Sequence, residues 1–221
     1  MSEQSPATVI SIYFPNIEED VIKAQADCVN KFLPYGWTFR QYAYKPRGEA
    51  YGHAAALKKC IEESKNDIVI CLDIDCFPLN EVALNILYRG AAEGMLVGAV
   101  QRANHIENDR HLYVSPACMA FSKTVYQQLG SPSFDATPYG DIGEELTYVW
   151  ERAKRSTVFL WPTSVEKKLW DLVEGKKFGI GTIYDDLFYH FFCVRDKTMQ
   201  KIFVERAKYY WNKDSLVEEK V

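Results

Sequence analysis

The residues best suited to do chemistry are two aspartates in the stretch DIVICLDIDCFPLN, which runs from Asp67 to Asn80. Asp73 and Asp75 are two residues apart, so their side chains point to one side wherever the backbone between them is extended. Carboxylate oxygens suit Mg²⁺ or Mn²⁺, ions that keep several waters and bridge to substrate phosphates. The pair therefore predicts a metal site that anchors a diphosphate. The alternative is that the two aspartates only cap a helix after Pro78.

The position of this pair depends on the apolar run from Ile68 to Leu72, which predicts a strand buried on both faces. In open α/β sheets, ligands bind outside the carboxyl ends of the strands. Strands and helices alternate along the chain, so we expect an α/β fold with a parallel sheet, and because no composition break marks a boundary, we expect a single domain, 1–221. Further strands are expected at 7–14, 38–44, 95–100, 113–121, 158–161 and 187–193, and helices at 18–33, 49–64, 80–89, 141–155 and 196–211.

Composition limits the class of protein. A net charge of -4 gives no polyanion-binding signature, so nucleic acid is not an expected partner and phosphate must be bound by local groups. The chain has no apolar stretch long enough to span a membrane, and its start lacks the features of a signal peptide. Its six cysteines form no CxxC pattern and suit buried thiols in a reducing compartment. These features predict a cytoplasmic protein, in which basic and aromatic residues of the last helix either touch an anionic membrane or form a solvated face.

Three acids gather at the expected start of the helix at 141–155. Asp141 and Glu144 fit the N-cap and N3 positions of a capping box, and Glu145 follows them. One of the three can serve as a catalytic base that faces a hydroxyl nucleophile. Favourable charge at a helix N-terminus is an alternative explanation for all three.

Two turns at expected strand ends offer other binding groups. Phe14 and Pro15 close the first strand, where a base or ribose can dock. Lys45 and Arg47 lie in the turn-rich loop KPRGEAYG, where they either contact a phosphate or remain solvated.

Two histidines have contrasting positions in the pattern. His53 falls on the apolar stripe of the helix at 49–64, which predicts a packed and hydrogen-bonded side chain. His190 is the polar residue of the run LFYHFFC. It is either a satisfied core histidine or, if its strand returns beside the central one, the third ligand of the metal.

The run from Gly48 to Leu79, GEAYGHAAALKKCIEESKNDIVICLDIDCFPL, resembles the nucleotide-sugar half of GT-A glycosyltransferases, in which a glycine-led helix precedes a buried strand that ends in the D-x-D motif. The later order is similar too: a strand of small residues (SPACMAF), an acid-bearing helix start (GEEL) and a late histidine. The resemblance covers most of the chain, and the D-x-D block is its specific part. It implies a single-domain α/β fold that is GT-A-like and Rossmann-like, with a mixed, mostly parallel central sheet flanked by helices. Within it, a nucleotide-sugar half is expected at 1–90, an acceptor half at 91–193 and a C-terminal helix at 194–212.

The resemblance also implies roles for particular residues. Asp73 and Asp75 would hold Mn²⁺ or Mg²⁺ against a nucleotide diphosphate, and His190 would complete the metal sphere. Glu145 falls in the family's base position with Glu144 before it, although this chain has Glu-Glu where Glu-Asp is usual and Asp141 is near enough to compete. The implied reaction is sugar transfer from a nucleotide-diphosphate sugar to an unidentified glycan, lipid or protein acceptor.

The family's usual aspartate in the loop after the first strand is missing, because Phe14, Pro15 and Asn16 stand there. Two other functions also fit parts of the pattern. Haloacid-dehalogenase-type phosphatases place D-x-D at a buried strand end, but Phe77 stands where they have Thr or Val. A domain of the same fold that binds without catalysing is the second alternative.

Overall fold

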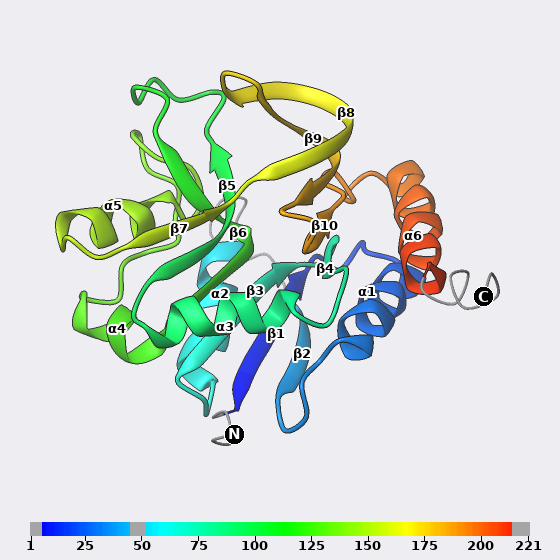
Figure 1. Cartoon of the computed structure of the whole chain (residues 1–221), viewed down its shortest axis with the longest axis horizontal. Coiled ribbons are helices and arrows are strands. Elements are labelled where there is room, and N and C mark those ends of the chain that lie inside the picture. Colours follow the sequence, from blue (N-terminus) through cyan, green and yellow to red (C-terminus); the bar gives the residue numbers. More distant parts are fainter. Residues whose placement is uncertain (1–5, 45–51, 214–221) are drawn as a thin grey trace.

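A six-stranded sheet runs through the protein, whose computed structural model describes residues 6–44 and 52–213 (Figure 1). Its strands lie in the order β2-β1-β3-β6-β5-β7. Every neighbouring pair is parallel except the two pairs that β6 makes, with β3 and with β5. The predicted mixed, mostly parallel sheet is therefore confirmed. The strands are β1 (Ala7–Tyr13), β2 (Thr38–Ala43), β3 (Ile68–Asp73), β5 (Leu96–Arg102), β6 (Leu112–Ser122) and β7 (Thr157–Leu160).

Helices cover both faces of this sheet, which explains why β3 is apolar throughout. Ile68, Ile70 and Leu72 point into one core with α1, α3 and α6, whereas Val69 and Cys71 point into a second core with α2, α4 and α5. This alternation is what a strand buried on both faces requires. The helices are α1 (Glu19–Lys31), α2 (Gly52–Glu63), α3 (Ala83–Ala92), α4 (Lys123–Gln128), α5 (Glu144–Arg152) and α6 (Lys197–Asn212).

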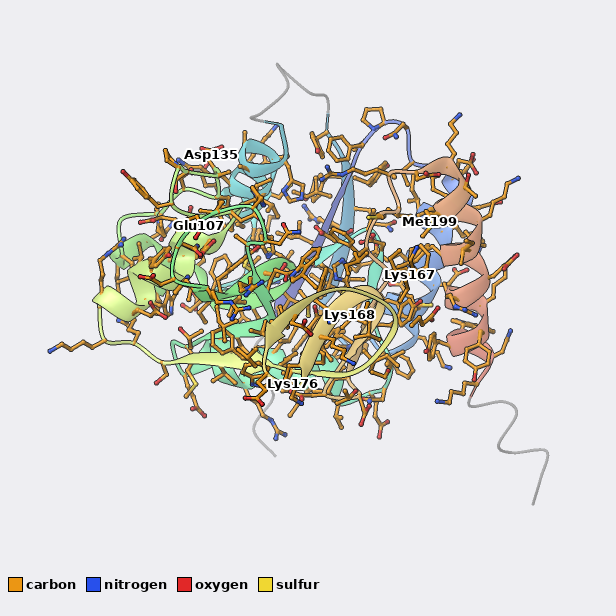
Figure 2. All side chains as sticks on the ribbon, turned by 90° about the horizontal axis from the view of Figure 1, so that it is seen from above. Glu107, Asp135, Lys167, Lys168, Lys176 and Met199 are labelled. Atoms are coloured by element: carbon orange, nitrogen blue, oxygen red, sulfur yellow. The ribbon has the colours of Figure 1, made fainter. Side chains whose placement is uncertain are left out.

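A second, antiparallel sheet has the strand order β4-β10-β9-β8. Its strands are β4 (Cys76–Pro78), β8 (Pro162–Val173), β9 (Lys176–Tyr184) and β10 (Phe188–His190). The hairpin of β8 and β9 crosses the middle of the molecule when seen from above, with Lys167, Lys168 and Lys176 on it (Figure 2).

The sequence analysis assigns no element to the residues of this hairpin, and the structure shows why. Much of β8 is exposed on both faces, so it lacks the apolar alternation that reveals a strand. In β9, a Cβ at Gly179 would lie 1.9 Å from the carbonyl oxygen of Lys167, so the two strands approach where only glycine fits. The short helix α4 is likewise absent from the sequence-based expectations.

Within the described part of the chain, none of the helices combines the length and apolar character that crossing a membrane requires. All six cysteines are free thiols, and Cys193 alone among them is exposed.

Candidate functional site

The D-x-D pair lies where the chain passes from one sheet to the other. Asp73 is the last residue of β3 in the central sheet, and Asp75 directly precedes β4 in the second sheet. Asp75 is only 5% exposed, and its Oδ2 accepts a 3.4 Å hydrogen bond from the Val194 backbone N–H. The predicted strand end thus delivers both carboxylates to the junction between the two sheets.

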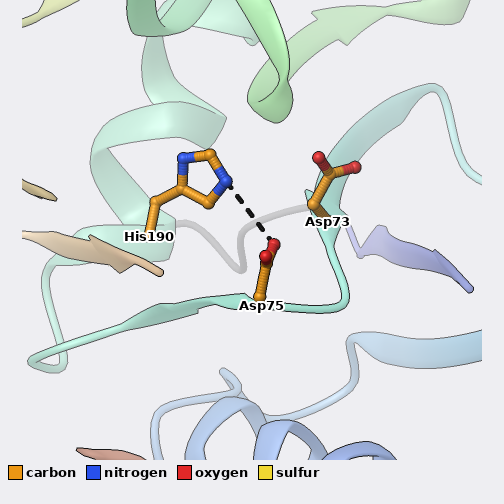
Figure 3. Close-up of side chains that lie close together, drawn as sticks. All are labelled: Asp73, Asp75 and His190. Carbon is orange, nitrogen blue, oxygen red and sulfur yellow. Dashed lines mark ion pairs between the residues drawn. The ribbon is translucent and has the colours of Figure 1, made fainter. Parts of the chain in front are cut away.

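His190 joins this pair because β10 runs antiparallel to β4, with His190 opposite Cys76. Its Nε2 is 3.5 Å from Oδ1 of Asp75 (Figure 3). One ligand atom from each of Asp73, Asp75 and His190 lies within 4.8 Å of the other two. Carboxylate oxygens with an imidazole nitrogen fit a divalent cation such as Mn²⁺, so the residues predicted to bind the metal do come together. We call these three residues the metal group.

Charges in the metal group are mutually stabilised. Burial would raise the pKa of Asp73, but the hydrogen bond and charge of His53 hold it below its usual value, with help from His190 and Arg195. Burial would lower the pKa of His190, yet the carboxylates of Asp75 and Asp73 raise it. The Asp73 carboxylate is therefore kept in its charged form, which is the form that binds a metal ion.

His53 reaches the metal group from the first turn of α2. Its Nε2 is 3.5 Å from Oδ1 of Asp73, and its side chain is 16% exposed. This packed, paired position agrees with the helical stripe in the sequence. The stripe alone could not reveal that Asp73 would be the partner, because the pairing arises from how α2 packs over the sheet.

A cavity of about 350 Å³ opens on one side of the metal group. The end of β1 contributes Ile12, Tyr13 and Phe14 to it, but Pro15 is not among its lining residues. The segment 192–196 also lines this cavity. The predicted docking place for a base or ribose is therefore a concave site at Phe14.

Arg195 is a binding candidate that the sequence analysis missed. Its guanidinium carbon lies 4.7 Å from the ring centroid of Phe14, and its charge contributes to the low pKa of Asp73. It follows a turn in which Phe192 and Cys193 both have positive φ, so no periodic pattern marks it. The two phosphate contacts that the sequence did predict, Lys45 and Arg47, lie outside the described residues.

A second cavity of about 270 Å³ adjoins the first. It shares five lining residues with the first cavity: His53, Asp73, His190, Phe192 and Arg195. Asp73 and His190 of the metal group therefore line both cavities, whereas Asp75 lines only the first. The remaining lining residues come from four places in the chain: Gln101, Asn104 and His105; Tyr113, Ser115, Pro116 and Ala117; Asp141 and Ile142; and Trp170.

The three acids predicted near the start of α5 occupy different environments. Asp141 lines the second cavity. Glu144 is fully buried and accepts hydrogen bonds from Asn108 and from the Asp141 backbone N–H. Glu145 lines neither cavity and pairs with Arg152 at 2.5 Å. Of the three, the structure brings only Asp141 to a cavity that the metal group also lines.

The predicted N-cap at Asp141 is wrong. The N-cap of α5 is Gly143, which has a left-handed φ of 78°. A Cβ there would lie 2.4 Å from Cγ of Pro116, so glycine is needed for space as well as for conformation. Half of the expected capping box nevertheless forms, because Oε2 of Glu144 accepts the Asp141 N–H at 2.8 Å.

A mixed α/β sheet with a pair of carboxylates at the carboxyl end of a strand is the arrangement in which open α/β folds bind their ligands. The sequence places the chain more closely. It matches the model of glycosyl transferase family 2 over residues 24–142, more than half of its length, and it belongs to that family. This match contradicts the phosphatase alternative.

Solved glycosyltransferases share the fold. The mannosyltransferase PcManGT from Pyrobaculum calidifontis, in complex with GDP-Man and Mn²⁺, is 14% identical over 72% of this chain, with a TM-score of 0.51. This chain spans 55% of that structure's chain. A mutant Drosophila beta-1,4-galactosyltransferase 7, in complex with manganese, UDP-Gal and xylobiose, is 15% identical over 83% of this chain and 70% of its own, with a TM-score of 0.51. Among curated proteins, none matches the sequence.

Proposed function

We propose that this protein transfers a sugar from a nucleoside diphosphate sugar to an acceptor hydroxyl, with Mn²⁺ or Mg²⁺ held by Asp73, Asp75 and His190. The observation that carries the proposal is the metal group itself, whose ligand atoms lie within 4.8 Å of one another and whose Asp73 and His190 line both cavities. The two similar structures contain a nucleotide sugar together with manganese, which supports the same arrangement here.

In this proposal, the two cavities bind different parts of the substrates. The nucleotide occupies the first cavity, against the ring of Phe14, and the sugar and its acceptor occupy the second. Arg195 and His53 line both cavities, so they face the diphosphate that joins the two parts of the donor. When bound, the cation neutralises negative charge on the departing diphosphate, and electrostatic stabilisation of this kind usually contributes more to catalysis than any other single effect.

We assign the base to Asp141, because it is the acid of the three that lines the second cavity. Its Oδ2 accepts a 3.3 Å hydrogen bond from the Tyr113 hydroxyl, and its Oδ1 accepts from the Ile142 N–H at 2.8 Å. These contacts orient the carboxylate without neutralising it. Glu145, which the resemblance favours, is the rival. Asp141→Asn should lower kcat by about 10²–10⁴-fold and Glu145→Gln should have little effect, as expected for loss of general base catalysis at one position only.

The decisive experiment combines binding with turnover. A thermal-shift screen of nucleoside diphosphates and nucleotide sugars, including UDP-Gal and GDP-Man, with and without Mn²⁺, should raise the Tm of the wild-type protein only when Mn²⁺ is present. Asp75→Asn, which keeps the shape of the buried side chain, should lose this shift and sugar transfer while remaining folded by circular dichroism.

The matched control is Asp171→Asn, since Asp171 is a surface aspartate paired with Lys168. Mn²⁺-independent binding by the wild type, or unchanged transfer by Asp75→Asn, would contradict the proposal. Mn²⁺-dependent binding without any transfer would instead identify a binding domain.

A further inference from the structure

Glu144 is a buried carboxylate that the proposed reaction does not use, and it joins two walls of the second cavity. We infer that Glu144 is a positioning residue, which holds both Asp141 and the loop 103–111 in place for the acceptor. This inference rests on the proposed function, in which the second cavity receives the acceptor.

The hydrogen bonds of Glu144 are unusually complete for a side chain with no exposed surface. Its Oε1 accepts from Nδ2 of Asn108 at 2.8 Å and lies 2.7 Å from Nδ1 of His111. Its Oε2 accepts from the backbone N–H of Asp141 at 2.8 Å. A charged carboxylate survives full burial only with such donors, so the cluster depends on all of them.

Oε1 of Glu144 attaches the loop 103–111 to α5 through Asn108 and His111. His111, at the end of this loop, also lies 3.3 Å from Oε2 of Glu151 and stacks on Tyr148 with ring centroids 3.9 Å apart. Asn108 in addition donates to the carbonyl oxygen of Tyr139. The same loop carries Asn104 and His105, which line the second cavity, so its attachment to α5 determines where those two side chains lie.

Oε2 of Glu144 holds the backbone at Asp141. Its bond to the Asp141 N–H fixes the backbone directly before the turn at Gly143, whose own N–H donates to the carbonyl oxygen of Phe134 at 3.0 Å. The Asp141 carboxylate is thereby held within reach of the Tyr113 hydroxyl. A single side chain thus sets the relative position of the assigned base and of a loop that lines the same cavity.

The chemistry of this cluster requires a carboxylate. Donors approach both oxygens of Glu144, and a glutamine offers one acceptor oxygen and one NH₂ group. Glu144→Gln therefore has the right shape but must present its NH₂ either to the Asp141 N–H or to the Asn108 and His111 donors. The hydrogen bond with the Asn108 NH₂ or the one with the Asp141 N–H is then lost, whereas the contact with His111 persists only if its neutral Nδ1 accepts from the new NH₂.

The test measures the two attachments directly, by amide hydrogen exchange in the wild-type protein and three variants. In Glu144→Gln, amides of 103–111 or of 139–142 should exchange at least about tenfold faster, while amides of β1 and β3 keep wild-type protection. His111→Gln should accelerate only the loop 103–111. Glu145→Gln is the matched control and should change neither segment.

Kinetic measurements distinguish a residue that positions the reacting groups from one that only stabilises the fold. For the transfer reaction found in the screen, Glu144→Gln should lower kcat/KM for the acceptor by about 10²-fold, the scale of a displaced reacting group. Its Mn²⁺ affinity should stay within about twofold of the wild type, because the metal group lies on other elements.

Wild-type exchange in both segments of Glu144→Gln would overturn the inference, as would uniform acceleration throughout the protein or an equal loss of Mn²⁺ affinity. Failure of the proposed function is distinguishable from this. A wild-type protein that binds no nucleotide with Mn²⁺ would end the proposed reaction, whereas the exchange measurement needs no substrate and still decides whether Glu144 joins the two segments.

Discussion

Each aspartate of the metal group has a histidine as its neighbour. Asp73 has His53 as its neighbour, and Asp75 has His190, each pair with its atoms 3.5 Å apart. Among the described residues, Nδ1 of His53 and Nδ1 of His190 are buried without a hydrogen-bond partner. The stability of each pair therefore depends on its carboxylate. A bound cation would compete with a proton for the ring nitrogen of His190.

His53 should tune the metal group without belonging to it. We expect His53→Gln to weaken Mn²⁺ binding by about 10–100-fold, as loss of a partner that orients a metal ligand typically does. Isothermal titration with Mn²⁺ measures this. His105→Gln is the control, because His105 is bonded to Asn104 and not to the metal group. Equal affinities for the wild type and His53→Gln would show that Asp73 needs no such partner.

His111 predicts a dependence of stability on pH. Burial would lower the pKa of His111, but its hydrogen bond to Glu144 and the charge of Glu151 raise it above the usual 6.5. A raised pKa in the folded state means that the stabilisation is complete below about pH 6.5 and is lost as pH rises through the folded-state pKa. Urea unfolding should therefore show a larger difference between the wild type and His111→Gln at about pH 6 than at about pH 9. A difference that grows with pH would contradict this pairing.

Among the elements, the start of α5 depends most on one residue type. Sequence patterns predicted the helix, but its N-cap is Gly143 and not the expected Asp141, because of the contact between Gly143 and Pro116. Pro116 lies in β6 and lines the second cavity. The position at which the helix begins therefore depends on a tertiary contact, which local sequence preferences do not predict.

Gly143→Ala should be strongly destabilising. The left-handed conformation costs a non-glycine residue about 1–2 kcal/mol, and overpacking against Pro116 adds about 1–3 kcal/mol. Gly130→Ala is a matched control, because Gly130 has a φ of 86° but no atom within 4 Å of the position that a Cβ would take. Urea unfolding of both variants should show the larger loss for Gly143→Ala. Equal losses would mean that Pro116 moves aside freely.

At the scale of the whole molecule, α6 packs against α1 and the second sheet, beside the first cavity. In Figure 1 it lies against α1, at the edge where β10 and β4 continue from the central sheet. Phe203 is fully buried, with its ring 5.9 Å from that of Phe77 and 6.0 Å from that of Phe191. The segment with Arg195 leads directly into this helix, so the position of the guanidinium depends on how α6 packs.

Phe203→Ala should lower the free energy of unfolding by about 3–5 kcal/mol, the usual range for deleting a buried aromatic ring. The neighbouring Ile202 is 36% exposed, and Ile202→Ala should cost much less. Urea denaturation gives both values. A small effect at Phe203 would indicate that the aromatic cluster repacks and that α6 contributes little to the stability of the whole.

Local patterns predicted several parts of this protein correctly. The apolar run ending at Asp73, the spacing to Asp75 and the helical stripes were sufficient for the α/β fold and for two carboxylates at a strand end, because periodicity and strand ends are local properties. The partners depend on contacts between distant parts of the chain: His190 beside Asp75 through the pairing of β10 with β4, His53 beside Asp73, Arg195 over Phe14, and Asp141 rather than Glu145 at the cavity. Strand β8 belongs with these, because it is largely exposed and is held by pairing with β9 and not by a buried face that the sequence displays.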